Sequence, residues 1–298
     1  MENEINFTKK IIEGQICFFS DINNNLSPLT FIIVPGNPSI EEFYFTFAVK
    51  FIQKFNSPVI ISSLASDTLK NYSLQNVIEK KKNFFEYLFN MNPNGKYFVI
   101  GHSIGNYILL KAIQSLNDSK QIIGIYNLFP AIQNLYNGFP LKFKILTNNI
   151  IIINICAIFS SLFQILPLCL IILFFKLISR MSRKTVECLA RNINYSFTKQ
   201  MLLLAKDEAN YIKDYTDDFI KFMNEISHKI KMVYGKNDKY GNEEIAKKFK
   251  ELVPKVELKI VNIKHTFAPK YSQDIFNEIY DWIKNDIDIN KLEMSKTQ

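Results

Sequence analysis

Residues 97–112, YFVIGHSIGNYILLKA, have the pattern of a β-strand, a sharp turn and an α-helix. Aromatic and β-branched residues at 97–100 are typical of a strand, and the later apolar spacing is typical of a helix. Between them, GHSIG places Ser103 at a strained turn that lifts its Oγ above the sheet edge. A side chain at Gly101 or Gly105 would drive the strand into the outgoing helix. Ser103 is therefore our candidate nucleophile, and an ordinary turn serine is the alternative.

Strand-like and helix-like segments alternate along most of the chain. The predicted strands cover residues 29–34, 59–62, 97–100, 121–128, 231–234 and 256–261, after one or two short antiparallel strands within 11–19. Amphipathic helices are predicted over residues 40–55 and 74–89. Such alternation predicts a mostly parallel central sheet flanked by helices, in one domain covering residues 1–298.

The composition excludes wholesale disorder and indicates neither nucleic acid nor a metal as a partner. Apolar residues make up 48% of the chain, and 36 basic against 28 acidic residues give a formal net charge of +8. This charge suits an anionic membrane surface, because no aromatic-basic RNA motif accompanies it. The cysteines have no paired or zinc-type spacing and the first residues, MENEINFTKK, have no signal-peptide core, so we expect a reducing, cytosol-facing location. No metal and no organic cofactor is expected.

The loop at residues 35–38, Pro-Gly-Asn-Pro, follows the predicted strand 29–34. In an α/β-hydrolase the loop at this place supplies one oxyanion-hole N–H, and the residue after the nucleophile, here Ile104, supplies the other. Proline has no N–H, which leaves Gly36 and Asn37. We favour Asn37 because it follows the flexible glycine and precedes a predicted helix. An ordinary strand-to-helix turn is the alternative.

Two later strands each deliver a polar residue to the same predicted sheet edge. Asp238 follows the strand 231–234 through a glycine turn, and His265 follows the strand 256–261. Sites in open α/β sheets lie along the carboxyl ends of the strands. Ser103, Asp238 and His265 then have the chain order of nucleophile, acid and base in an α/β-hydrolase fold.

The chain offers other candidates for the base and for the acid. The chain has three histidines, and His102 adjoins the nucleophile on a turn that points it away, whereas His228 precedes its strand at the wrong sheet edge. His265 remains as the base. The acids that compete with Asp238 are Asp217, Asp218 and Glu243. Of these four, Asp238 alone follows an apolar strand directly.

Residues 131–228 form a predicted inserted cap, because the interval between two strands is far longer than an ordinary connection. Within it, residues 145–175 carry no charge. One membrane crossing here would place halves of one sheet on opposite sides, and two crossings need about 40 residues. We therefore expect a re-entrant hairpin bent near Pro167, or helices lying in the interface, with the flanking Lys and Arg on the cytosolic side. A buried apolar helix is the alternative.

With PGNP after a strand, GHSIG, LFPAI, an apolar cap, YGKND and KHTFA, the chain resembles the lipid droplet-associated hydrolase family of α/β-hydrolases over most of residues 29–285. The resemblance implies a serine hydrolase of lipid esters, of sterol ester or acylglycerol type. It implies action at the lipid droplet or endoplasmic reticulum surface, on the cytosolic face. By match to the family motifs, Ser103 carries over as nucleophile, Asp238 as acid and His265 as base.

The chain also departs from the family pattern. Ser39 stands where the family loop usually continues PGNPG, and Lys239 and Tyr240 stand where Pro and an aromatic residue typically follow the acid. Two other functions stay open: a non-catalytic lipid-surface binding protein with a vestigial triad, and an esterase or thioesterase of soluble acyl substrates.

Overall fold

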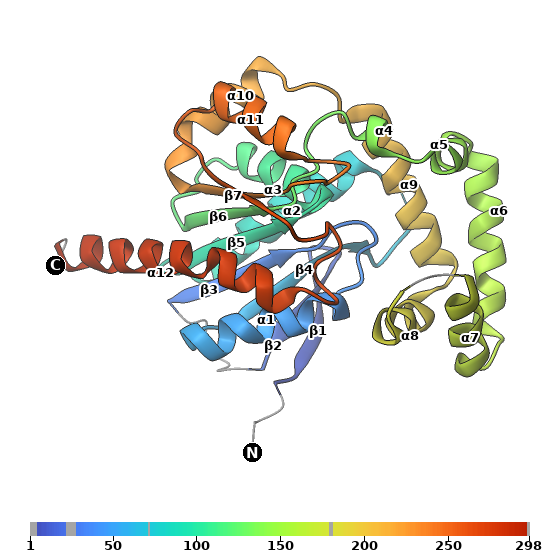
Figure 1. The fold of residues 1–298 in the computed structure, drawn as a ribbon. Helices are drawn as coiled ribbons and strands as arrows, with labels where there is room; N and C mark the ends of the chain where they lie inside the picture. The colour runs from blue at the N-terminus through green and yellow to red at the C-terminus, as the bar shows by residue number, and fades with distance from the viewer. Residues whose placement is uncertain (1–4, 22–27, 71, 179–180, 297–298) are drawn as a thin grey trace.

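The computed structural model describes residues 5–21, 28–70, 72–178 and 181–296, and an eight-stranded sheet lies at its centre (Figure 1). The strands are β1 (Phe7–Ile12), β2 (Gln15–Ser20), β3 (Leu29–Val34), β4 (Val59–Ser66), β5 (Lys96–His102), β6 (Ile122–Leu128), β7 (Ile230–Gly235) and β8 (Glu257–Val261). Their order in the sheet is β1-β2-β4-β3-β5-β6-β7-β8. The pairs β1–β2 and β2–β4 are antiparallel and the remaining pairs are parallel, which confirms the predicted mostly parallel sheet.

Every predicted strand overlaps an observed one. The short strands predicted within residues 11–19 are a full hairpin of β1 and β2, and β4 extends to Ser66, beyond its predicted end at residue 62. The strand β3, LTFIIV, is buried from Thr30 onward. It is apolar on both faces because helices cover both sides of a parallel sheet.

Two groups of helices form these two layers. The first group is α1 (Glu42–Phe55) and α12 (Ser272–Lys296), which share a core with one face of the sheet. The second group is α2 (Leu74–Met91), α3 (Ile104–Gln114), α10 (Asp217–Glu225) and α11 (Glu243–Leu252), which share a core with the other face. Neighbouring residues of β3 divide between the layers, with Phe31 in the first core and Ile32 in the second, as the pleat of a strand requires.

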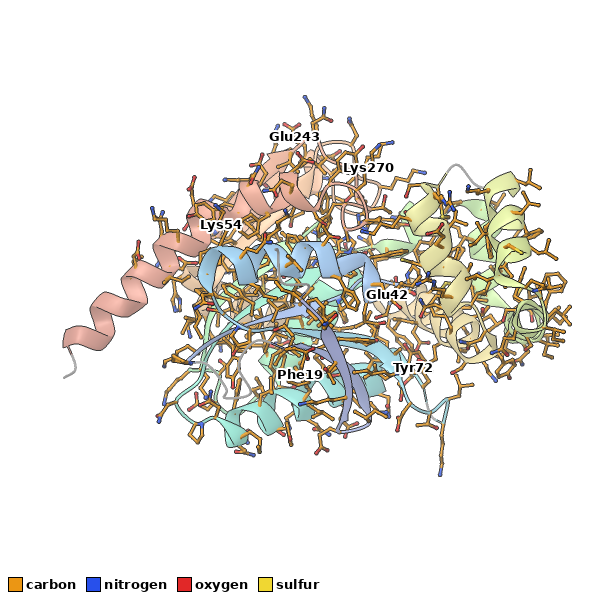
Figure 2. The ribbon with its side chains drawn as sticks, turned by 90° about the horizontal axis from the view of Figure 1, so that it is seen from below. Phe19, Glu42, Lys54, Tyr72, Glu243 and Lys270 are labelled. Carbon is orange, nitrogen blue, oxygen red and sulfur yellow. The ribbon has the colours of Figure 1, made fainter. Side chains whose placement is uncertain are left out.

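The helices between β6 and α10 lie to one side of the sheet, beside the carboxyl ends of its parallel strands (Figure 1). They are α4 (Leu135–Gly138), α5 (Leu141–Asn148), α6 (Ile150–Ser161), the short 3₁₀ helix η1 (Leu162–Gln164), α7 (Leu168–Ile178), α8 (Arg183–Asn192) and α9 (Tyr195–Tyr211). Figure 2 shows Glu42 at the end of α1 that faces this group, where Asn192 of α8 donates a hydrogen bond to its carboxylate.

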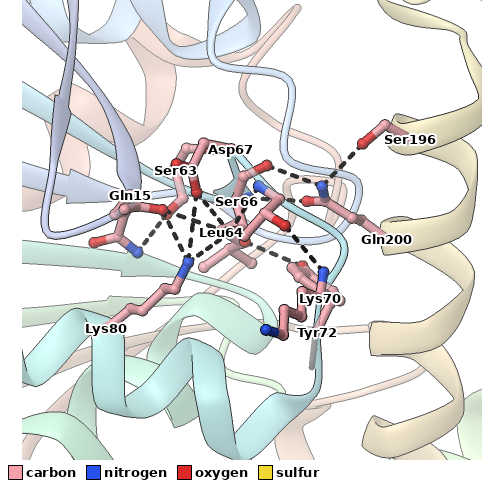
Figure 3. A network of polar contacts seen from close by, with 12 residues as sticks. Gln15, Ser63, Leu64, Ser66, Asp67, Lys70, Tyr72, Lys80, Ser196 and Gln200 are labelled. Carbon is pink, nitrogen blue, oxygen red and sulfur yellow. Dashed lines mark hydrogen bonds and ion pairs between the residues drawn. The ribbon is translucent and has the colours of Figure 1, made fainter.

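Helix α9 joins this group to the sheet through polar contacts. Figure 3 shows Gln200 reaching from α9 to Ser66 at the end of β4, where its amide makes two 2.9 Å hydrogen bonds with the Ser66 backbone. Farther along α9, the carboxylate of Asp207 accepts a 2.8 Å hydrogen bond from the N–H of Leu74 at the start of α2. These contacts place one face of α9 over the strand ends.

The uncharged run of residues 145–175 is divided among α5, α6, η1 and α7, with a break between η1 and α7 at the predicted position of Pro167. In the part of the chain that the structure describes, no helix combines the length and apolar character needed to cross a membrane. Most of the exposed large apolar side chains among the described residues nevertheless lie between Leu141 and Met181. We call this set the apolar surface: Leu141, Ile145, Ile150, Ile151, Ile155, Ile158, Phe159, Leu162, Ile165, Leu166, Leu168, Leu170, Leu173, Phe174, Leu177 and Met181.

Candidate active site

Ser103 occupies a sharp turn between β5 and α3. Its backbone has φ 54° and ψ −128°, a conformation that non-glycine residues rarely adopt and that occurs at functional turns. The Ser103 N–H donates to the carbonyl of Leu128, and the Asn106 amide donates to the carbonyls of both residues. These hydrogen bonds hold the turn between β5, β6 and the first turn of α3.

The two glycines of the turn are needed for close approach. A Cβ on Gly101 would lie 2.3 Å from Oδ1 of Asn106 on α3, as predicted. The prediction for Gly105 is wrong in its partner, because a Cβ there would lie 2.3 Å from the carbonyl oxygen of Pro35. The helix α3 therefore starts against the loop that follows β3, and Gly105 allows that contact.

Ser103, His265 and Asp238 form one hydrogen-bonded series. His265 Nε2 lies 2.8 Å from Ser103 Oγ, and His265 Nδ1 lies 2.6 Å from Asp238 Oδ2. The Asp238 side chain is 1% exposed and that of His265 is 18% exposed, so the acid is buried while the base has access to solvent. A carboxylate only accepts, so Nδ1 carries the ring proton and Nε2 can accept the hydroxyl proton of Ser103.

The competing acids and His228 lie on other elements. Asp217 and Asp218 are in the first turn of α10, and Glu243 at the start of α11 pairs with Lys247. His228 lies in the 3₁₀ helix η2 (Ser227–Lys229), which precedes β7. Among the described residues, the carboxylate that is hydrogen-bonded to His265 is that of Asp238.

Aromatic rings enclose the His265 imidazole. The ring centroid of Tyr240 lies 5.0 Å from that of His265, and the Phe129 centroid lies 5.9 Å away. Phe129 has a positive φ of 47° at the end of β6, in the LFPAI segment. These two rings were not among the site residues expected from the sequence. The position of Phe129, directly after the predicted strand 121–128, was a signal that it lies at the site edge of the sheet. Both rings restrict the orientation of the imidazole.

The loop after β3 lies directly against the nucleophile. A Cβ on Gly36 would lie 2.8 Å from the Cβ of Ser103. The Gly36 N–H is occupied, because it donates a 3.0 Å hydrogen bond to the hydroxyl of Tyr44. Among the described residues, the N–H groups of Asn37 and Ile104 donate to no protein acceptor. These two groups are therefore candidate donors to a negatively charged oxygen at Ser103.

The Asn37 side chain fastens this loop to α9. Its Nδ2 donates hydrogen bonds of 3.0 Å to the carbonyl of Met201 and 2.9 Å to Oε1 of Glu208. Burial raises the pKa of Glu208 to about 8, against the opposing effect of the Asn37 hydrogen bond. Sequence reasoning missed Glu208, because a single acidic residue in an amphipathic helix has no local signal that distinguishes it from a solvated one.

His102 is buried and makes two contacts that its position in the sequence did not indicate. Its Nδ1 lies 2.6 Å from the Tyr44 hydroxyl, and its Nε2 lies 2.9 Å from the backbone carbonyl oxygen of His265. Burial, followed by the nearby His265, lowers the pKa of His102 to about 3. Sequence reasoning set His102 aside as a base, and it assigned no role to Tyr44.

Within residues 5–21, 28–70, 72–178 and 181–296, no three His, Cys, Asp or Glu side chains are grouped so as to hold a metal ion.

A family model described as "Lipid-droplet associated hydrolase" matches residues 27–268. The chain belongs to the lipid droplet-associated hydrolase family. A lipid droplet-associated hydrolase of Dictyostelium discoideum is 27% identical over 278 residues, which cover 88% of this chain and 89% of the relative. A lipid droplet-associated hydrolase of Gallus gallus is 23% identical, over 90% of this chain and 88% of the relative.

Solved structures confirm the α/β-hydrolase fold of this lipid droplet-associated hydrolase family member. An esterase from Thermogutta terrifontis has a TM-score of 0.64 at 12% identity, with 94% of this chain and 99% of that chain covered. A haloalkane dehalogenase variant from Bradyrhizobium elkanii has a TM-score of 0.69 at 9% identity, with 97% and 100% covered. Because one fold serves both esterase and dehalogenase, the fold alone does not determine which reaction this site catalyses.

Proposed function

We propose that this family member is a serine hydrolase of lipid esters, of sterol ester or acylglycerol type, with Ser103 as nucleophile, His265 as base and Asp238 as acid. The observation that carries the proposal is the series Asp238–His265–Ser103, joined at 2.6 Å and 2.8 Å on a strained turn. A turn serine with no catalytic role has no need of a strained backbone and an aligned imidazole.

The mechanism follows from the direction of these hydrogen bonds. His265 Nε2 takes the proton of Ser103 as Oγ attacks the ester carbonyl, and buried Asp238 stabilises the imidazolium that forms. The oxyanion accepts hydrogen bonds from the free N–H groups of Ile104 and Asn37. The imidazolium then protonates the leaving alcohol, and a water molecule activated by His265 hydrolyses the acyl-enzyme.

The apolar surface supports a lipid interface as the place of action. Exposed apolar side chains in such number along one segment mark a surface that another phase or partner covers. Exposed Lys176, Arg183 and Lys184 flank it and add attraction to anionic headgroups. The relatives named above are lipid droplet-associated by name. We therefore propose that the protein acts at the lipid droplet and endoplasmic reticulum surface, on the cytosolic face. Residues 131–228 are the proposed cap, and its apolar surface is the part that contacts lipid.

The test is turnover of a panel of sterol, glycerol and short-chain soluble esters, with and without emulsified lipid. Wild type is expected to hydrolyse emulsified esters and to react at Ser103 with a fluorophosphonate probe. Ser103→Ala should lose both, whereas Ser115→Ala, a change at an exposed serine at the end of α3, should lose neither. Equal activity of wild type and Ser103→Ala would refute the assignment of the nucleophile.

Two results of this panel identify the rival functions. A wild type that binds lipid emulsions but neither turns over esters nor reacts with the probe is a lipid-surface binding protein with a vestigial triad. A wild type whose activity is confined to soluble esters or thioesters, and is unchanged by emulsified lipid, is an esterase of soluble acyl substrates.

A further inference from the structure

A second hydrogen-bonded series runs behind the nucleophile. The Gly36 N–H lies 3.0 Å from the Tyr44 hydroxyl, the hydroxyl lies 2.6 Å from His102 Nδ1, and His102 Nε2 lies 2.9 Å from the carbonyl oxygen of His265. Tyr44 is 3% exposed and His102 is 7% exposed. The series therefore joins, without solvent, the loop after β3, helix α1, the end of β5 and the loop after β8.

Each hydrogen bond in this series has one possible direction. The carbonyl of His265 can only accept, so Nε2 of His102 carries a proton. Burial keeps the ring neutral by lowering its pKa, so Nδ1 is an acceptor and the Tyr44 hydroxyl donates its hydrogen bond to it. The Tyr44 oxygen in turn accepts from the Gly36 N–H. All three polar groups are satisfied, and the His102 tautomer is determined.

The series ends at the two loops that carry the candidate oxyanion donor and the proposed base. It occupies the Gly36 N–H and leaves the Asn37 N–H as a free donor of a loop that lies against Ser103. It also holds the backbone of His265, whose Nε2 must stay 2.8 Å from Ser103 Oγ. We infer that His102 and Tyr44 are positioning residues, which hold the oxyanion loop and the base loop in register around Ser103. This inference rests on the proposed function.

A neutral His102 is also compatible with a positive charge on the neighbouring His265 during the reaction. The two imidazole centroids, of His102 and His265, are 5.2 Å apart. A positive charge on His102 would repel the His265 imidazolium that forms in the reaction. The ring is fixed by Phe267, whose centroid lies 4.9 Å away nearly edge-on, and by Phe129. A merely space-filling histidine would not need one nitrogen bonded to the carbonyl of His265 and the other bonded to Tyr44, which in turn holds Gly36.

Kinetics of three variants on a soluble short-chain ester test the inference. Since a displacement of about 1 Å near the reacting atoms costs about 100-fold, His102→Leu should lower kcat about 100-fold with KM changed less than about 2-fold. His102→Gln, which keeps an N–H donor for the His265 carbonyl, should recover about 10-fold of that loss. Tyr44→Phe should lower kcat about 10-fold. Active sites are counted by complete reaction with the fluorophosphonate, so that unfolded protein does not enter kcat.

A measurement on wild type keeps the inference testable if a variant does not fold. Long-range ¹H–¹⁵N spectra at pH 7 should show His102 as the neutral Nε2–H tautomer. Its signals are those lost neither in His228→Gln, a change at an exposed histidine, nor in His265→Ala. A His102 imidazolium or an Nδ1–H tautomer would overturn the series of hydrogen bonds.

The kinetic outcomes separate the two proposals. An active wild type whose His102→Gln and Tyr44→Phe variants keep the wild-type kcat, whatever their Tm, overturns the positioning role alone. A wild type that neither turns over esters nor reacts with the fluorophosphonate overturns the proposed function, and with it the kinetic role of both residues.

Discussion

The side-chain amide of Asn37 donates a 2.9 Å hydrogen bond to the carboxyl group of Glu208. This contact joins the loop that lies against Ser103 to helix α9, the helix that also bonds the end of β4 through Gln200. A buried carboxyl on α9 thus lies one side chain away from the candidate oxyanion hole, and its protonation state bears on the stability of that contact.

Glu208 should make the folded protein less stable as pH rises. Its folded pKa is about 8, above its ordinary value of 4.5, so the folded state holds this proton more tightly than the unfolded state. The stability it contributes is complete below about pH 4.5 and is lost as pH rises toward and through 8. Tm of wild type should therefore fall between pH 5 and 7 relative to Glu208→Gln, which keeps the acceptor without the titration.

The comparison is made by circular dichroism melts at pH 5, 6 and 7. The range stops at 7 because burial lowers the pKa of Lys81 to about 7, so that its titration affects stability with the opposite sign at higher pH. Glu244→Gln, a change at an exposed residue on α11, is the control and should follow wild type. Parallel curves for wild type and Glu208→Gln would contradict the raised pKa.

Ser103→Ala should abolish ester hydrolysis with little change in Tm. The loss of kcat is expected to be roughly 10⁴-fold or more, because members of such a triad act as a unit. Tm should stay close to that of wild type, because removing one hydroxyl from a half-exposed turn leaves little cavity. A variant that is inactive but also unfolds well below wild type would leave the assignment dependent on fluorophosphonate labelling, with mass spectrometry identifying the modified residue.

The acid is tested by amide substitution. Asp238→Asn should lower kcat by about 10⁴-fold, because the amide no longer holds His265 in the tautomer that accepts from Ser103. His265→Ala should lose at least as much. Asp217→Asn and Asp218→Asn, at exposed positions of α10, should stay within about 2-fold of wild type, since surface changes of this kind are nearly neutral. A silent Asp238→Asn beside an inactive Asp217→Asn or Asp218→Asn would move the acid.

Charges within the apolar surface should release the protein from lipid. Ile155 and Leu170 are both exposed, and burying each side chain contributes about 1.5–3 kcal/mol, so Ile155→Asp with Leu170→Asp should weaken binding roughly 100-fold or more. Co-sedimentation with phosphatidylcholine–phosphatidylserine vesicles containing triolein measures this. Turnover of a soluble short-chain ester should be kept, because the proposed triad lies on the sheet.

The matched control for this pair is Ile289→Asp, at an exposed apolar residue of α12 outside the apolar surface. It should bind vesicles as wild type does. Undiminished sedimentation of the double variant would show that the apolar surface is not the part that meets lipid.

The sequence by itself was enough for the order of the strands, the turn at Ser103 and the expectation that Asp238 and His265 meet Ser103. Apolar strands such as residues 97–100 and 231–234 are recognisable locally, because strand propensity and the absence of charge are properties of adjacent residues. Parallel strands end at a common edge, so the residues that follow them are expected to meet. Neither inference requires knowledge of how the helices pack.

Only the tertiary structure decided which groups around Ser103 are already engaged. Tyr44 and Glu208 come from helices whose local sequence is ordinary, and their contacts with Gly36, Asn37 and His102 span 8 to 171 positions of the chain. Such partners depend on the packing of α1 and α9 over the strand ends, which no local periodicity encodes. The same holds for residues 145–175, where the pattern shows that the run is apolar, while only packing determines which side chains remain at the surface.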